Sequence, residues 1–177
     1  MKLVNEHLKD EKLVKHVLAV EAIMRNLAKH LGEDEELWGL VGLIHDLDYQ
    51  ETMNSPELHA TKTVEYIQGL VPEDVVNAVK AHNYEYTKVQ PQTKLEKALI
   101  CSDAVSGLII AAALVMPDKK LEQVRVKTLK KKFKDKTFAA KTGRDRIRLC
   151  EEIGVPLADF FSISLEALQK ISEDLGL

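Results

Sequence analysis

Apolar side chains recur every three or four residues along most of the chain, which is the period of an amphipathic α-helix. Similar patterns predict helices over seven ranges: 11–31, 34–46, 56–68, 72–82, 94–116, 144–153 and 156–175. The basic stretch before residue 144 is expected to add one or two more. No run alternates convincingly between apolar and polar residues, as a strand would. The pattern therefore predicts an all-α fold, a single helical bundle over residues 1–177.

Helix-start signals and loops divide this pattern. Ser55 followed by Pro56 is typical of a helix start, which would place His59 in the first turns of that helix. Residues 49–55 and 83–92 are predicted to be polar loops.

The range 94–116 is the most apolar, and between Ala98 and Met116 its only charge is Asp103. A charge at mid-bilayer costs roughly 3 kcal/mol. We therefore expect a buried core helix here rather than a membrane span.

The N-terminal residues are charged throughout and lack the apolar stretch of an export signal. The two cysteines, Cys101 and Cys150, are too few for a disulfide framework. The sequence thus predicts reduced thiols and a cytoplasmic location.

Charge is distributed unevenly along the chain. Residues 119–148 hold 13 of the 25 Lys and Arg but only three acids, so this segment carries +10. The net charge of −3 then leaves −13 on the rest of the chain. A basic segment on an acidic body favours an anionic ligand, although a solvated helix face is the alternative explanation.

A candidate site begins with His45 and Asp46, which stand side by side at the end of an apolar helix. Buried polar groups without partners cost several kcal/mol. A metal ion would compensate, since imidazole and carboxylate are both good ligands; a hydrogen-bonded core histidine beside a helix-end acid is the alternative. The other candidates each lie on or beside the apolar face of a separate predicted helix: His16, His59, His82 and Asp103. Four inward histidines and two inward aspartates in one small bundle predict a metal site.

This ordered set resembles the HD-domain superfamily of metal-dependent phosphohydrolases, whose pattern is a histidine, then His-Asp, then a distant aspartate. Superfamily members with two metals carry additional histidines between the His-Asp pair and the last aspartate, as His59 and His82 do here. The resemblance covers a metal-bearing core of about 11–116. The extension of about 117–177 resembles that of small bacterial or archaeal HD proteins of similar length.

The resemblance implies one or two divalent metal ions per chain, with Mn²⁺, Fe²⁺, Co²⁺ or Zn²⁺ favoured over Mg²⁺ for a mixed nitrogen and oxygen site. One metal would be held by His16, His45, Asp46 and Asp103, and Asp46 would bridge to a second held by His59 and His82. The implied activity is hydrolysis of a nucleotide or other small phosphorylated metabolite by metal-activated water. Asp46 and Asp48 are the candidate catalytic residues.

The sequence departs from the superfamily pattern in two places. Many relatives continue HD-x-G-K, whereas Asp48-Tyr49 replaces Gly-Lys here, and Asn83 follows His82 where some two-metal relatives have a histidine pair. Asp48 is left with three roles: an acid behind the ligands, a general base, or a loop residue.

Two other functions stay open: an HD-type di-iron oxygenase, and a non-catalytic module that binds a nucleotide or nucleic acid. The basic segment offers few aromatic residues for base stacking, only Phe133 and Phe138, and both are predicted to be buried. We expect a small phosphorylated substrate as the partner, rather than nucleic acid or a membrane. Pairing of two copies of the chain is also left open.

Overall fold

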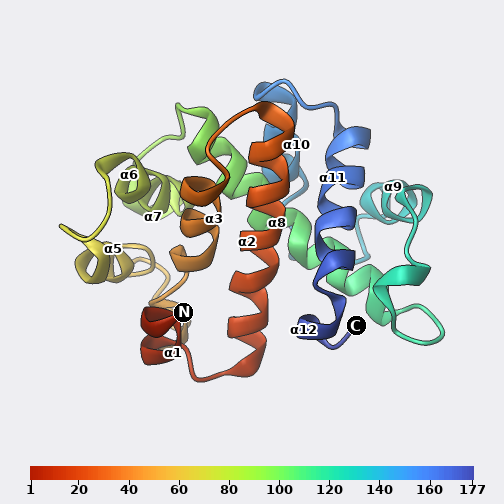
Figure 1. Cartoon of the computed structure of the whole chain (residues 1–177), viewed down its shortest axis with the longest axis horizontal. Helices are drawn as coiled ribbons and strands as arrows, with labels where there is room; N and C mark the ends of the chain where they lie inside the picture. Colours follow the sequence, from red (N-terminus) through yellow and green to blue (C-terminus); the bar gives the residue numbers. More distant parts are fainter.

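Two long helices, α2 (Glu11–Leu31) and α8 (Lys94–Leu114), pack against each other near the centre of the fold, with α8 passing behind α2 in Figure 1. The computed structural model describes all residues from 1 to 177. It contains helices and no strand, which confirms the predicted all-α class. A core cluster of 44 buried residues extends from Val4 to Leu175 and so joins the N-terminal and C-terminal helices.

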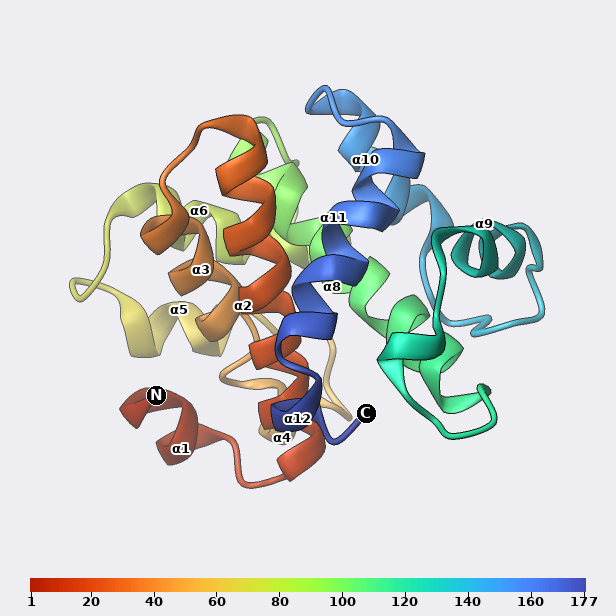
Figure 2. The same ribbon diagram turned by 45° about the vertical axis from the view of Figure 1, so that its right-hand side comes forward.

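The remaining helices lie on the two sides of α2, as Figures 1 and 2 show. On one side are α3 (Glu35–Ile44), α5 (Thr61–Ile67), α6 (Glu73–His82) and α7 (Tyr84–Thr87); on the other are α9 (Val126–Lys134), α10 (Arg144–Glu152) and α11 (Leu157–Lys170). Four short elements complete the chain: α1 (Lys2–His7), α4 (Tyr49–Thr52), the 3₁₀ helix η1 (Leu121–Gln123) and α12 (Ser172–Leu175).

Local side chains determine where three helices that lead to or carry candidate ligands begin. Asp10 caps α2 by accepting a hydrogen bond from the Lys12 amide, and Asp34 caps α3. Thr93 and Glu96 form a capping box at the start of α8, in which each side chain accepts from the other residue's backbone amide. These caps satisfy amides that no helical carbonyl can reach, and so fix the register of the helices that carry the candidate ligands.

Several predicted helix limits are wrong. The helix expected from residue 56 begins at Thr61, so that His59 lies in the turn before α5. The expected loops contain the short helices α4 and α7, and the expected final helix is divided into α11 and α12. These differences are confined to short elements and helix ends, where tertiary contacts override local sequence signals.

By length and composition α8 could cross a membrane, but 61% of its most apolar stretch is buried inside the fold. It packs against α2, α6, α9, α10 and α11. These contacts identify it as the core helix that the position of Asp103 predicted.

Candidate metal centre

The six predicted ligands lie together, although they come from five separate parts of the chain. His16 is on α2 and Asp103 on α8, while His45 ends α3 and Asp46 follows it in the next turn. The last two are His59, in the turn before α5, and His82, the final residue of α6. Helix ends and the turns beside them supply four of the six, and only His16 and Asp103 lie within long helices.

One group of ligand atoms surrounds His16. Its Nε2 lies 3.3 Å from Asp103 Oδ1 and 3.5 Å from Asp46 Oδ2. The Nε2 of His45 lies 3.3 Å from Asp46 Oδ1. Ligand atoms of His16, His45 and Asp46 all fall within 4.8 Å of one another, which is close enough to hold one ion.

A second group lies on the other side of Asp46. The Nε2 atoms of His59 and His82 are each 3.4 Å from Asp46 Oδ1, and 2.9 Å from each other. Ligand atoms of Asp46, His59 and His82 also fall within 4.8 Å of one another. The Asp46 carboxylate thus lies between the two groups, the position that a bridging ligand requires.

Hydrogen bonds at Nδ1 determine which nitrogen of each ring is free. His45 Nδ1 lies 2.8 Å from the Gly42 carbonyl, and His82 Nδ1 lies 2.5 Å from the Val79 carbonyl. A carbonyl can only accept, so both rings carry their proton on Nδ1 and direct the Nε2 lone pair toward Asp46. His45 Nε2 is buried and has no hydrogen-bond partner.

Nitrogen lone pairs directed at a carboxylate oxygen repel it unless a positive charge lies between them. His59 Nδ1 also contacts an acceptor, Asp48 Oδ1, at 2.7 Å, so its Nε2 likewise faces the centre. The unpartnered nitrogen of His45 and the short approach of His59 to His82 therefore fit a divalent cation. The residues present thus match the metal-binding chemistry expected from the sequence.

Without a metal, protons provide the compensating charge. Burial lowers the pKa of His16, but hydrogen bonds to Asp103 and Asp46 outweigh this effect and raise it to about 10. Burial lowers the pKa of His45 to about 4, which keeps this ring neutral. Burial opposes ionisation of Asp103, yet its hydrogen bond with His16 lowers the pKa to about 2. A neutral donor ring and an ionised carboxylate are the forms in which these residues bind metals.

Asp48 lies behind the ligands rather than in the pocket. Its side chain is fully buried. One carboxylate oxygen contacts His59 Nδ1, and the other accepts a hydrogen bond from the Thr63 amide at 3.0 Å. Thr63 is in the first turn of α5, so Asp48 caps that helix from a distance while it orients the imidazole. Of the three roles left open, this geometry favours the acid behind the ligands.

The HD-domain family model matches residues 13–108. The chain belongs to the HD-domain family. The matched range covers more than half of the sequence and contains all six candidate ligands, from His16 to Asp103. The resemblance drawn from the sequence is therefore confirmed at the level of the family. No solved structure matches the chain.

The candidate metal centre of this HD domain opens into a pocket of about 400 Å³. Five of the six candidate ligands line it, while His45 is fully buried and does not. The complete lining is Leu13, His16, Asp46, Tyr49, His59, His82, Asn83, Asp103 and Arg146. Arg146 comes from α10, outside the matched range. The charge of the basic segment pointed to this region of the chain, but no sequence signal distinguished Arg146 from its neighbours.

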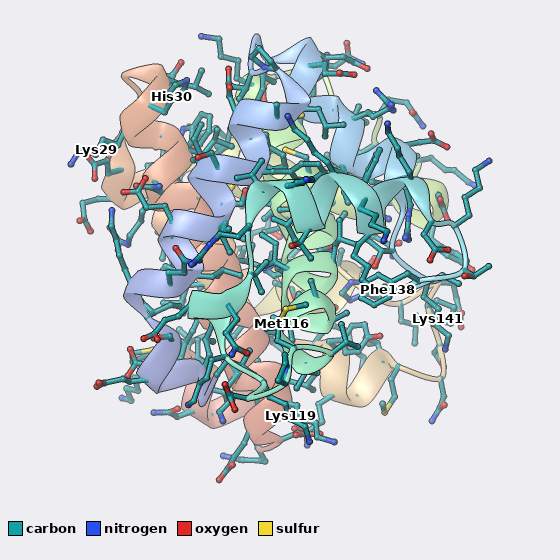
Figure 3. All side chains as sticks on the ribbon, turned by 90° about the vertical axis from the view of Figure 1, so that its right-hand side faces the viewer. Lys29, His30, Met116, Lys119, Phe138 and Lys141 are labelled. Carbon is teal, nitrogen blue, oxygen red and sulfur yellow. The ribbon has the colours of Figure 1, made fainter.

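Arg146 is the only residue of the basic segment that lines the metal pocket. The segment includes η1, α9 and the turns after α9, and Figure 3 labels three residues from this part of the chain, Lys119, Phe138 and Lys141. Phe133 is buried as predicted, whereas Phe138 is only partly buried, with Lys132 Nζ 4.1 Å from its ring centre. No open aromatic surface for stacking bases is therefore formed by these two rings.

Proposed function

We propose that this HD protein is a metal-dependent phosphohydrolase acting on a nucleotide or another small phosphorylated metabolite. The observation that carries the proposal is the placement of the Asp46 carboxylate between two histidine groups at the base of an open pocket. The HD-domain family consists mostly of metal-dependent hydrolases, which supports the same reaction class.

The ligand assignment follows the two groups. His16, His45, Asp46 and Asp103 would hold one ion, and Asp46 would be shared with a second ion at His59 and His82. Mn²⁺, Fe²⁺, Co²⁺ and Zn²⁺ suit these nitrogen and oxygen donors. When bound, such ions lower the pKa of water and stabilise the charge of a transferring phosphoryl group.

The chain's own residues bind and orient the participants. The pocket wall is mostly polar, which suits a small charged ester more than an apolar molecule. Asp48 and the Gly42 carbonyl hold His59 and His45 in the orientation required of ligands. In the reaction the oxygen of water joins phosphorus, the ester P–O bond breaks, and the alcohol leaves with a proton. A cytoplasmic setting suits Cys101 and Cys150, which are both buried free thiols.

The test is a panel of phosphate esters assayed with chelator-treated protein to which single divalent metals are returned, under air and under argon. We expect phosphate release that needs metal and does not need O₂. Consumption of O₂ with an organic substrate would instead identify an oxygenase, and metal binding without either reaction would identify a binding module.

Two variants make the test specific. Asp46→Asn should lose both metal binding and phosphate release, because it removes charge from the ligand shared by the two groups. His30→Ala is the matched control, since His30 is exposed near the end of α2 (Figure 3) and takes no part in the centre. Equal metal content and activity in the two variants would contradict the assignment.

A further inference from the structure

A second pocket adjoins the metal pocket. It has a volume of about 270 Å³, compared with about 400 Å³ for the first. The two share three residues: His16, Asp103 and Arg146. The far wall of the second pocket is formed by residues of α8 and of the segment leading into α10: Ala104, Gly107, Lys141, Thr142 and Gly143. A molecule in the metal pocket can therefore extend into this space without leaving the protein surface.

Arg146 lies at the junction of the two pockets and is held there by several contacts. Its guanidinium donates to the His82 carbonyl, lies 5.7 Å from the ring centre of Tyr84, and approaches Asp103 Oδ2 at 3.9 Å. Its side chain is 25% exposed and lines both pockets. An arginine that is held in place at such a junction can donate hydrogen bonds to phosphate oxygens.

The far wall adds further features that attract an anion. Lys141 is exposed and lines the second pocket, and Figure 3 shows it on the molecular surface. The helix α10 starts after Gly143 without a side-chain cap, so no capping side chain accepts from its first amides. The positive end of a helix of this length favours a negative group. Compared with the metal pocket, the second pocket adds Lys141 and the start of α10 to the residues that both share, which are Arg146, His16 and the carboxylate of Asp103.

The position of Gly107 keeps this space open. A Cβ atom built at Gly107 would meet only one neighbour, Thr142 Oγ1, at 3.8 Å. The residue is exposed on the pocket side of α8, and its missing side chain leaves room that a larger residue would fill.

We propose that the second pocket binds a second phosphate group of the substrate through Arg146 and Lys141, so that the preferred substrates are small metabolites with two phosphates. This inference rests on the proposed function, in which the phosphate to be hydrolysed lies at the metal centre. The second phosphate is bound and not cleaved. It accepts hydrogen bonds from the Arg146 guanidinium and the Lys141 ammonium, and so adds affinity that a monophosphate does not gain.

The experiment compares two matched substrates, adenosine 5′-monophosphate and adenosine 3′,5′-bisphosphate, with the metal-loaded protein. We expect a higher kcat/KM for the bisphosphate in the wild type. Lys141→Ala should reduce this preference about tenfold, the usual effect of losing one charge-assisted hydrogen bond. Gly107→Leu should reduce it as well by filling the pocket. Lys127→Ala, which removes an exposed lysine on α9, is the control that keeps the preference.

A binding measurement separates failure of this inference from failure of the proposed function. Inorganic pyrophosphate is titrated calorimetrically into chelator-treated protein, where no hydrolysis is needed. Weaker binding in Lys141→Ala and Gly107→Leu than in Lys127→Ala supports the site even if no ester is hydrolysed. The inference is overturned if the wild type does not prefer the bisphosphate while it releases phosphate from both esters. It is also overturned if all three variants bind pyrophosphate equally.

Discussion

Gly42 lies where α3 comes closest to α2, and replacing it by alanine tests how the fold positions His45. A Cβ atom at Gly42 would lie 2.9 Å from both Cα and N of Glu21 and 3.0 Å from the carbonyl carbon of Val20. Carbon atoms in good contact are about 3.5 to 4.0 Å apart. Because the obstructing atoms are backbone, the two helices must separate by about 0.6 Å or more.

Two effects on stability oppose each other in Gly42→Ala. Overpacking of this kind costs about 1 to 3 kcal/mol, whereas alanine is favoured over glycine in a helix by about 1 kcal/mol. We therefore expect a net loss of about 1 kcal/mol in the free energy of unfolding. The effect on metal binding should be larger. The Gly42 carbonyl holds His45 Nδ1, and metal–ligand distances tolerate only about 0.2 Å, so affinity should fall about 10- to 100-fold.

Gly39→Ala in the same helix is the matched control. Its Cβ would lie 2.5 Å from Arg25 Nε, but this neighbour is a flexible side chain that can move aside. Denaturant unfolding of chelator-treated protein measures stability, and calorimetric titration with Mn²⁺ measures affinity. If Gly42→Ala matches the wild type in both, or if the two glycine variants lose affinity equally, the reasoning from helix contact to ligand position is wrong.

Four further predictions concern the candidate metal centre and the basic segment. Asp48→Asn should lower metal affinity at the His59 position about 10- to 100-fold, measured by metal stoichiometry, and an unchanged second site would contradict the positioning role. His16, with its pKa raised to about 10, should release a proton when metal binds near neutral pH, so metal affinity should rise with pH; titrations in buffers of different ionisation enthalpy measure this release. In metal-free protein the stabilisation from protonated His16 should be complete below about pH 6.5 and lost as pH rises through about 10, as thermal unfolding can show. Neutralising residues 130–132 together should flatten the salt dependence of kcat/KM for an anionic ester without changing metal content, whereas unchanged salt dependence would exclude long-range attraction by these lysines.

The helices and the family could be predicted from the sequence because both depend on the type and spacing of residues along the chain. Apolar spacing located α2, α6 and α8 closely, and the order of six ligands identified the HD domain. The start of α5 could not be predicted, because the local signal at Ser55-Pro56 is overridden by Asp48, whose carboxylate caps the helix from 15 residues away. Ala60, with φ of 72°, adopts the reversed backbone that this arrangement requires.

Arg146 shows a second limit of sequence reasoning. It is one of 13 basic residues in 119–148, and nothing in its immediate neighbours distinguishes it. It enters the pocket because α10 packs along α8. This packing brings Arg146 close to Asp103, although the two residues are more than 40 positions apart in the sequence. The six candidate ligands can thus be predicted from residue type and order. Which basic residue lies beside them depends on how the helices pack, and so cannot be predicted in this way.

The packing of α10 on α8 also makes the spacing between the two pockets a rigid property of the molecule. Asp103 and Arg146 stand on two helices in direct contact, so the distance from the metal ligands to the guanidinium does not depend on the turns at 135–143. Changes in those turns can move Lys141 and alter how strongly a substrate is bound at its far end, but they leave the separation of Asp103 and Arg146 unchanged. The separation between the two charged groups of a substrate would therefore be determined mainly by the α8–α10 pair. The affinity for the substrate would depend in addition on the turns at 135–143.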